Sequence, residues 1–191
     1  MTKEEAYVKY KEIFDFAEIG KELEEIVDAQ TLINAPAAPS KDSGIAYDGA
    51  LMFHTIMAWH FANKLLPIYE KIAPVNQKSL AKVIVLYQLG KVDMFEPNKN
   101  NWEIEKLGKV YSFKESNVCL KTGERAKLLC NNAGVTFTTE EYEAMSILDK
   151  TPEEYDNMTK YRTHLSTLVK LSNDMAFAIE RERYKNSLKN D

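Results

Sequence analysis

The chain has 191 residues, 45% of them hydrophobic, and one domain of this size can bury a sizeable core. Its formal net charge is −4, which leaves no excess of positive charge to neutralise a phosphate backbone, so general nucleic-acid binding is not expected. Two cysteines are too few for a disulfide framework, and no apolar run approaches the ~20 residues that span a bilayer. Because the N-terminus also lacks an apolar signal core, we expect a cytoplasmic protein that does not enter a membrane.

The first 33 residues are predicted to form a helical arm. Residues 4–16 and 18–32 place apolar side chains at spacings of three and four, which is typical of amphipathic helices. Residues 34–44 contain two prolines, a glycine and small polar residues, so they are predicted to form a loop. The sequence therefore divides into an arm (1–33) and a helical domain (34–191), which together form one globular unit.

Two core helices are predicted next in the chain. Residues 48–72 are compatible with a helix until Pro67 perturbs the final turns, and His54 lies near its start. Residues 76–89 are predicted to form a second helix that ends at Gly90. Its dense run of apolar residues indicates that it lies in the core.

A small β-hairpin and three further helices complete the predicted fold. Residues 102–105 and 109–113 alternate apolar with polar side chains around a glycine, a pattern that favours a hairpin. The remaining helices are predicted at residues 122–133, 138–148 and 159–185. The expected fold is a mainly α-helical bundle with a small β-hairpin insertion.

Two segments carry a resemblance to a known family. Residues 47–55 read Tyr-Asp-Gly-Ala-Leu-Met-Phe-His-Thr and resemble the Tyr-Glu-Gly-Gly-Leu-Leu-Glu-His-Thr stretch of the HD (histidine–aspartate) superfamily of metal-dependent phosphohydrolases, with His54 at the first metal-ligand position. Residues 85–92 read Val-Leu-Tyr-Gln-Leu-Gly-Lys-Val and resemble that family's Leu-Leu-His-Asp-Leu-Gly-Lys-Val. Tyr87 and Gln88 stand where this motif has its histidine and aspartate.

The last predicted helix extends the resemblance. Residues 165–176 are similar to the closing helix of such domains, which ends in an alanine/serine-x-aspartate-x-x-alanine pattern. Asp174 is assigned to that last ligand position. The similarity runs through roughly residues 36–180 in the right order. It implies an HD-like helical bundle that is degenerate at its central His-Asp motif.

The replaced motif bears directly on metal binding. HD-type catalysis needs histidine nitrogens and carboxylate oxygens on one divalent ion, which activates water and polarises a phosphoryl oxygen. A protonated phenol is a poor ligand and a glutamine amide is neutral, so His54 and Asp174 would form only a weak metal site. No cofactor is expected, and a divalent metal only at low occupancy. As a simple core residue, His54 would hydrogen-bond Asp174, Gln88 or a backbone carbonyl.

The sequence favours a degenerate HD domain without metal-dependent hydrolase activity. Such a protein keeps a pocket for a nucleotide-like or phosphorylated small ligand, or keeps the fold to bind a protein partner or to form a homo-oligomer. In the family the Gly-Lys stretch lies close to the substrate phosphate, so Lys91 is a ligand and catalytic candidate, together with Asp93. The expected pocket residues are His54, Tyr87, Gln88, Lys91 and Asp174.

Two alternatives stay open. One is an active metal-dependent phosphohydrolase that acts on nucleotides or on nucleic-acid phosphoesters. Its metal shell would be completed by the nearest carboxylates, Asp48, Asp93 and Glu96. The other is a purely structural module for oligomerisation, with the pocket collapsed around Tyr87.

Overall fold

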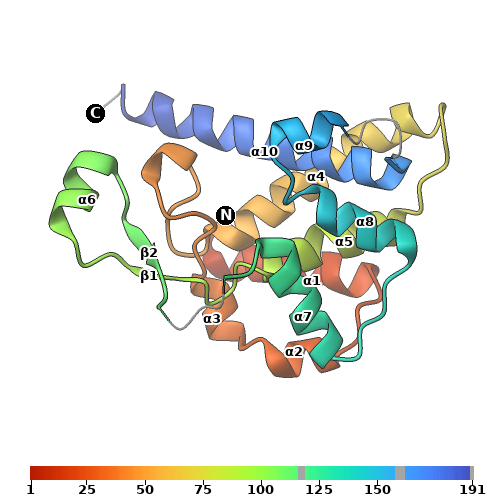
Figure 1. Cartoon of the computed structure of the whole chain (residues 1–191), viewed down its shortest axis with the longest axis horizontal. Coiled ribbons are helices and arrows are strands. Elements are labelled where there is room, and N and C mark those ends of the chain that lie inside the picture. Colours follow the sequence, from red (N-terminus) through yellow and green to blue (C-terminus); the bar gives the residue numbers. More distant parts are fainter. Residues whose placement is uncertain (116–118, 158–161, 190–191) are drawn as a thin grey trace.

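The computed structural model describes residues 1–115, 119–157 and 162–189, which are mainly α-helical with one small antiparallel sheet (Figure 1), as predicted. No helix in these ranges is long and apolar enough to cross a membrane. The helices are α1 (Lys3–Phe16), α2 (Glu22–Ile26), α3 (Ala29–Asn34), the short 3-10 helix η1 (Lys41–Ser43), α4 (Ala50–Tyr69), α5 (Gln77–Leu89), α6 (Asn101–Leu107), α7 (Thr122–Asn132), α8 (Thr139–Ile147), α9 (Pro152–Asn157) and α10 (His164–Ser187).

The N-terminal arm is packed into the main core. Helix α1 begins at a capping box in which Thr2 and Glu5 exchange side-chain to backbone hydrogen bonds. Its apolar face buries Tyr10 and Phe14 in the same cluster as α4 and α5. The helix predicted over residues 18–32 is in fact two short helices, because the Asp28 carboxylate accepts the Thr31 backbone N–H at 2.7 Å and starts a new helix there.

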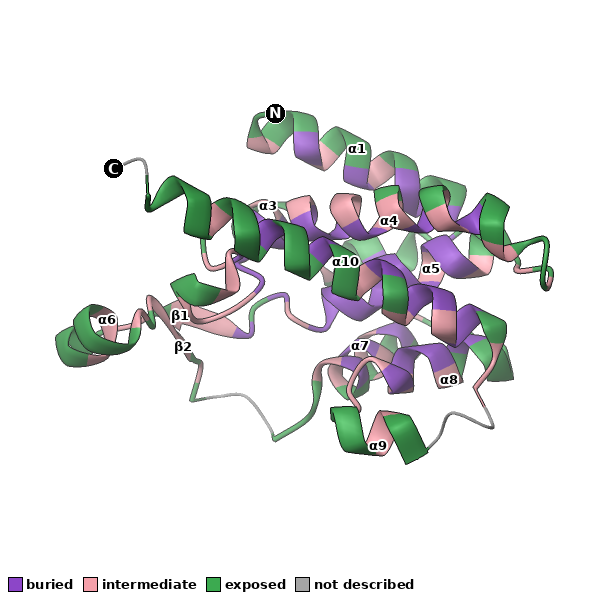
Figure 2. Ribbon diagram, turned by 90° about the horizontal axis from the view of Figure 1, so that it is seen from above, coloured by how far each residue is buried: buried purple, intermediate pink, exposed green. Residues whose placement is uncertain are grey.

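Helices α4, α5 and α10 form the centre of the molecule. Helix α10 packs along α4 and also contacts α5 and α8. Figure 2 shows buried residues on the facing sides of these helices, whereas the C-terminal half of α10 is largely exposed. Every residue of α5 from Val83 to Leu89 is buried, so the end of this helix, where Gln88 lies, is deep in the interior.

The end of α5 is fixed by a close contact with α7. A Cβ atom on Gly90 would lie 2.0 Å from the backbone oxygen of Thr122, which leaves room only for a glycine hydrogen. The Arg125 guanidinium donates from Nε to the Gly90 carbonyl oxygen at 2.9 Å. These contacts hold the turn that carries Lys91.

The hairpin is present, but its first strand was misplaced by the sequence analysis. Strand β1 (Phe95–Pro97) pairs with β2 (Tyr111–Phe113), and residues 102–105, predicted as a strand, belong to α6. The reason is local, because the Asn100 side chain accepts the backbone N–H groups of Trp102 and Glu103 and so caps a helix. The hairpin and α6 project from one end of the molecule (Figure 1).

The last helix begins at His164 and is capped by Thr163, whose hydroxyl accepts the Ser166 backbone N–H at 3.2 Å. It ends two residues later than the predicted end at residue 185. The predicted start at residue 159 lies outside the described residues. Helix α9, with Pro152 as its first residue, was not predicted.

Candidate functional site

A buried hydrogen-bonded network is centred on His54 of α4. The imidazole is 1% exposed; its Nδ1 lies 2.6 Å from Glu180 Oε2 and its Nε2 lies 3.1 Å from Asn173 Oδ1. Gln88 Nε2 donates to the same Asn173 oxygen at 3.0 Å. Helices α4, α5 and α10 therefore meet at a polar centre inside the core.

The network fixes how many protons its members hold. The Asn173 carbonyl oxygen can only accept, so His54 Nε2 must carry a hydrogen. Nδ1 then either donates to the Glu180 carboxylate or accepts from the protonated acid, and in both cases the His54–Glu180 pair is neutral overall. Both ring nitrogens of His54 are thus engaged by protein groups.

The structure corrects the assignment of Asp174. Its carboxylate is half exposed and pairs with Lys170 of the same helix at 2.6 Å, whereas the preceding residue, Asn173, contacts His54. Successive residues of an α-helix are rotated by about 100°, so only one of these two side chains can face α4. Glu180 lies seven residues after Asn173, about two turns, and shares its face.

Tyr87 and Gln88 are both buried but have different partners. The Tyr87 hydroxyl donates to Asp149 Oδ1 at 3.2 Å, at the end of α8, and not to the His54 network. Burial raises the pKa of Tyr87, which keeps its phenol protonated. Burial also raises the pKa of Asp149, although the Gly123 backbone N–H donates to its other oxygen at 2.8 Å.

Lys91 is a partly buried cation near this centre. Burial lowers the pKa of its ammonium group to about 8, against the opposing effect of the Glu180 and Asp149 carboxylates. No described residue accepts a hydrogen bond from its Nζ, and the Tyr87 ring centroid lies 6.0 Å away. That Lys91 contacts a ligand stays a prediction.

The other candidate carboxylates lie around the hairpin. Asp93, a catalytic candidate from the sequence, is exposed, has a positive φ of 57° and pairs with Lys114. Asp48 accepts from the Tyr111 hydroxyl at 2.7 Å, and Glu96 pairs with Ser112 across the two strands. The structure therefore does not bring these three side chains to His54.

The residues around His54 do not fit a divalent ion. Within the described ranges, no group of three or more His, Cys, Asp or Glu side chains is placed to hold a metal. His54 and Asp174, the two ligands expected from the sequence, are not brought together. The groups that do surround His54 are two amides and one carboxylate, and that carboxylate is bonded to the imidazole itself.

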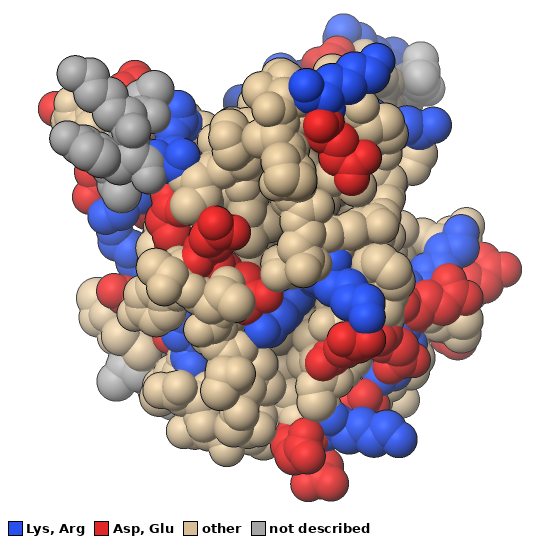
Figure 3. Space-filling model, turned by 90° about the vertical axis from the view of Figure 1, so that its right-hand side faces the viewer, with Lys and Arg blue, Asp and Glu red and all other residues tan. Residues whose placement is uncertain are grey.

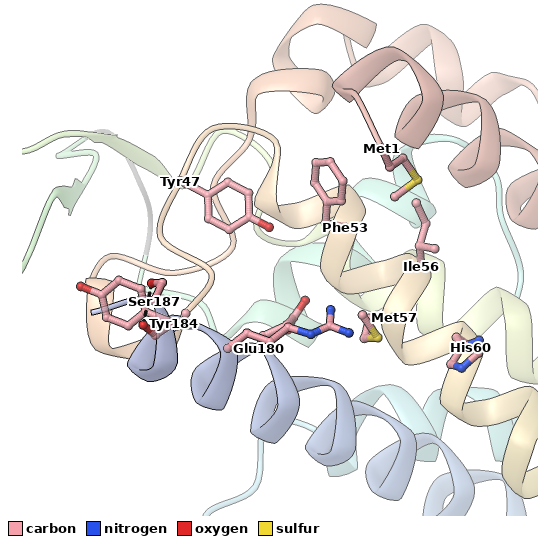
Figure 4. A pocket seen from close by; sticks show the side chains of 11 residues that line it. Met1, Tyr47, Phe53, Ile56, Met57, His60, Glu180, Tyr184 and Ser187 are labelled. Carbon is pink, nitrogen blue, oxygen red and sulfur yellow. Dashed lines mark hydrogen bonds between the residues drawn. The ribbon is translucent and has the colours of Figure 1, made fainter. Parts of the chain in front are cut away.

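A cavity of about 730 Å³ lies between α4 and the C-terminal half of α10 (Figure 4). Tyr47 and Phe53 lie on one side, with ring centroids 6.2 Å apart, and Glu180 lies on the other. Burial and the nearby Glu180 charge raise the pKa of the Tyr47 phenol. The other lining residues are Met1, Gly44, Ile56, Met57, His60, Arg183, Tyr184 and Ser187.

Glu180 connects the cavity with the buried network. It lines the cavity, and its Oε2 atom contacts His54, so a molecule in the cavity would be one side chain away from the imidazole. Arg183, one turn along α10, lines the same cavity and forms no ion pair with any described residue. Neither Glu180 nor Arg183 was predicted from the sequence, although the spacing of seven residues from Asn173 to Glu180 places these two side chains on one face of the helix.

On the face shown in Figure 3, basic and acidic side chains lie intermixed. Comparison of the chain with protein-family models, with curated proteins and with solved structures gave no match.

Proposed function

We propose that this chain is a degenerate HD-like domain that binds a nucleotide-like or phosphorylated small ligand and does not carry out metal-dependent hydrolysis. The observation that carries the proposal is the make-up of the network around His54. The resemblance calls for a second histidine and two carboxylates there. Gln88 and Asn173 contribute only amides to this network, and Tyr87, at the histidine position of the motif, bonds Asp149 instead. The residue that faces His54 from α10 is Asn173, whose amide is neutral. The site therefore lacks the aspartate of the closing helix as well as the histidine and aspartate of the central motif.

The loss of charge makes a divalent ion costly at this centre. A metal would need the lone pair of His54 Nε2, which means breaking the hydrogen bond to Asn173 and removing the proton that Nε2 carries. The amide oxygens would then face a dication whose only nearby carboxylate in the described ranges, Glu180, is already bonded to the imidazole, and a poorly compensated buried charge is unfavourable. The carboxylates considered for an active hydrolase, such as Asp48 and Asp93, have partners at the hairpin.

The cavity beside Glu180 supports the ligand half of the proposal. Its volume of about 730 Å³ falls in the usual range for small-molecule sites, about 300–1,000 Å³. Tyr47, Phe53 and Tyr184 supply aromatic side chains that could pack against a planar base. Arg183, which forms no ion pair with any described residue, supplies a guanidinium for an anionic group. These features match a ligand with one flat aromatic part and one negatively charged part.

The experiment titrates the protein with purine and pyrimidine nucleoside monophosphates and with inorganic phosphate. Binding is measured by calorimetry and by the change in melting temperature. We expect at least one nucleotide to bind, and Arg183→Ala to weaken it roughly tenfold, since hydrogen bonds to charged groups contribute about 1.5–3 kcal/mol. Arg181→Ala is the matched control, because Arg181 is exposed on the same helix and does not line the cavity. Equal loss in both variants, or no nucleotide binding to the wild type, would refute the proposed ligand class.

A further inference from the structure

One wall of the cavity beside Glu180 is a loop segment between η1 and α4. Gly44 and Tyr47 of this segment both line the cavity. The Tyr47 ring lies across the cavity from α10 and next to Phe53, with ring centroids 6.2 Å apart (Figure 4). Tyr47 is 44% exposed, so packing covers only part of this side chain.

The two ends of the loop segment are held in different ways. At Gly44 the chain passes so close to α10 that a Cβ atom would lie 2.5 Å from the Glu180 backbone oxygen. The next residue, Ile45, is buried in the core. Tyr47 and Asp48 follow these anchors and are both exposed. The position of Tyr47 therefore depends on contacts outside the core.

The hairpin insertion supplies such contacts. The Tyr111 hydroxyl of β2 donates to Asp48 Oδ1 at 2.7 Å. The Tyr111 backbone N–H donates to the Pro39 carbonyl oxygen at 3.1 Å. The Lys41 backbone N–H donates to the Gly108 carbonyl oxygen at 2.9 Å. The insertion is thus bonded to both ends of the loop that forms the cavity wall.

The bond from Tyr111 to Asp48 is the strongest of these contacts by type. Hydrogen bonds with one ionised partner are about twice as strong as neutral ones. Burial and the Asp48 carboxylate raise the pKa of Tyr111 to about 12, so the phenol keeps the hydrogen that it donates. The Lys3 ammonium lies 4.0 Å from the other Asp48 oxygen, and surface ion pairs contribute little.

We propose that Tyr111 is a positioning residue for the ligand cavity, because through Asp48 it holds the loop end at which Tyr47 faces Phe53 and α10. This inference rests on the proposed function, in which Tyr47 contacts the flat part of a nucleotide. Loss of the Tyr111 hydroxyl releases the loop end. The ligand then binds only the fraction of molecules whose wall is in place, and its apparent affinity falls by that fraction.

The test measures binding of adenosine monophosphate by calorimetry in the wild type and in four variants. We expect Tyr111→Phe and Asp48→Ala each to weaken binding about fivefold, the effect of about one net hydrogen bond. The double variant should lose no more than either single variant, since both remove the same bond. Asp48→Asn keeps an acceptor oxygen for Tyr111 and should bind like the wild type.

Tyr69→Phe is the matched control for Tyr111→Phe. It also removes one phenol oxygen, but that hydroxyl lies 3.4 Å from His164 Nδ1, and Tyr69 does not line the cavity. We expect wild-type affinity for adenosine monophosphate in this variant. Weakening by the same factor in Tyr69→Phe and Tyr111→Phe would overturn the proposal.

A second readout needs no ligand. The Tyr47 and Phe53 rings are close enough for a nuclear Overhauser effect between their protons. We expect this signal to weaken strongly in Tyr111→Phe and to persist in Asp48→Asn. An unchanged signal, or equal affinity for adenosine monophosphate in Tyr111→Phe and the wild type, would overturn the proposal. If the wild type binds no nucleotide but the ring signal is lost in Tyr111→Phe, the proposed ligand class fails and the positioning of Tyr47 by Tyr111 stands.

Discussion

At the scale of single residues, Glu180 is the side chain on which the buried network depends most. Its carboxylate lies 2.6 Å from His54 Nδ1 and is almost fully buried, so its removal leaves a buried imidazole without its partner. We expect Glu180→Ala to lower the free energy of unfolding by about 3 kcal/mol, as for other broken buried pairs. Urea denaturation measures this change.

Asp174→Ala is the matched control for that measurement. Asp174 also carries a carboxylate on α10, but it pairs with Lys170 at the surface, where ion pairs contribute about 0–1 kcal/mol. If Asp174→Ala destabilised the protein as much as Glu180→Ala, the assignment of Asn173 and Glu180 to the network would be wrong.

Lys91 gives a prediction about pH. Its pKa is about 8 in the folded protein and close to the ordinary lysine value in the unfolded chain, so between these two values the unfolded chain binds more protons. The contribution of Lys91 to stability must then rise with pH through that window. At pH 7 the buried ammonium is unfavourable, and we expect Lys91→Met to be more stable than the wild type.

The difference in unfolding free energy between Lys91→Met and the wild type should shrink steadily as pH rises from about 8 towards about 10.5. Taking the difference between the two proteins cancels the titration of tyrosines and of other lysines. A difference that is constant over this range would show that Lys91 is solvated like an ordinary surface lysine.

At the scale of elements, the contact between α5 and α7 places the residues of the central motif. Gly90 follows α5 with φ −60°, where alanine is sterically allowed, so only the approach of Thr122 requires glycine. We expect Gly90→Ala to destabilise the protein by about 1–3 kcal/mol through overpacking. Thermal or urea unfolding measures this loss.

Gly20→Ala is the comparison variant. The added Cβ at Gly20 would meet only the end of the flexible Glu22 side chain, which can move away. We expect little change or a slight gain in stability from the reduced freedom of the unfolded chain. Equal effects at Gly20 and Gly90 would mean that α7 does not pack against the end of α5 as described.

Helical periodicity was sufficient to predict most helices, because α1, α4, α5, α7 and α8 each bury a continuous apolar face. It failed where local capping decides the structure. Asp28 divides one predicted helix into α2 and α3, and Asn100 starts α6 in a segment too short for its apolar alternation to distinguish strand from helix. These segments are only a few residues long, so a single capping side chain has more influence on their structure than the apolar pattern.

The candidate site could be predicted in part. His54, Gln88 and Lys91 come from two motif segments, and α4 and α5 bring them near one another. Asp174 was chosen from a residue pattern, whereas the buried positions of α10, Ser172 and Ala176 among them, set a helical phase that favours Asn173. Glu180 had no signal of its own, because a buried glutamate looks like a surface residue until its partner is known.

At the scale of the whole molecule, the arm and the helical domain share one hydrophobic core. Phe16 of α1 contacts the Trp59 ring of α4 with centroids 5.7 Å apart, while the other tryptophan, Trp102, is 60% exposed on α6. In Trp102→Phe the fluorescence reports only Trp59 and hence the docking of the arm. We expect its unfolding transition to coincide with that of circular dichroism, as in a two-state protein.

Phe14→Ala extends this test to the core itself. Phe14 is 3% exposed, and its truncation should lower the unfolding free energy of the whole protein by about 3–5 kcal/mol. The unfolding transitions measured by Trp59 fluorescence and by circular dichroism should shift by the same amount. A fluorescence transition that moves while circular dichroism stays in place would show that residues 1–33 unfold as a separate arm.

The central proposal is that this chain is a degenerate HD-like domain without metal-dependent hydrolysis, and metal content tests it most directly. The measurement compares bound Mn²⁺ per chain in the wild type, in Tyr87→His/Gln88→Asp/Asn173→Asp, and in the same triple variant with His54→Ala. We expect no stoichiometric metal in the wild type, binding near one ion per chain in the triple variant, and its loss without His54. Stoichiometric metal in the wild type, or none in the triple variant, would contradict the account.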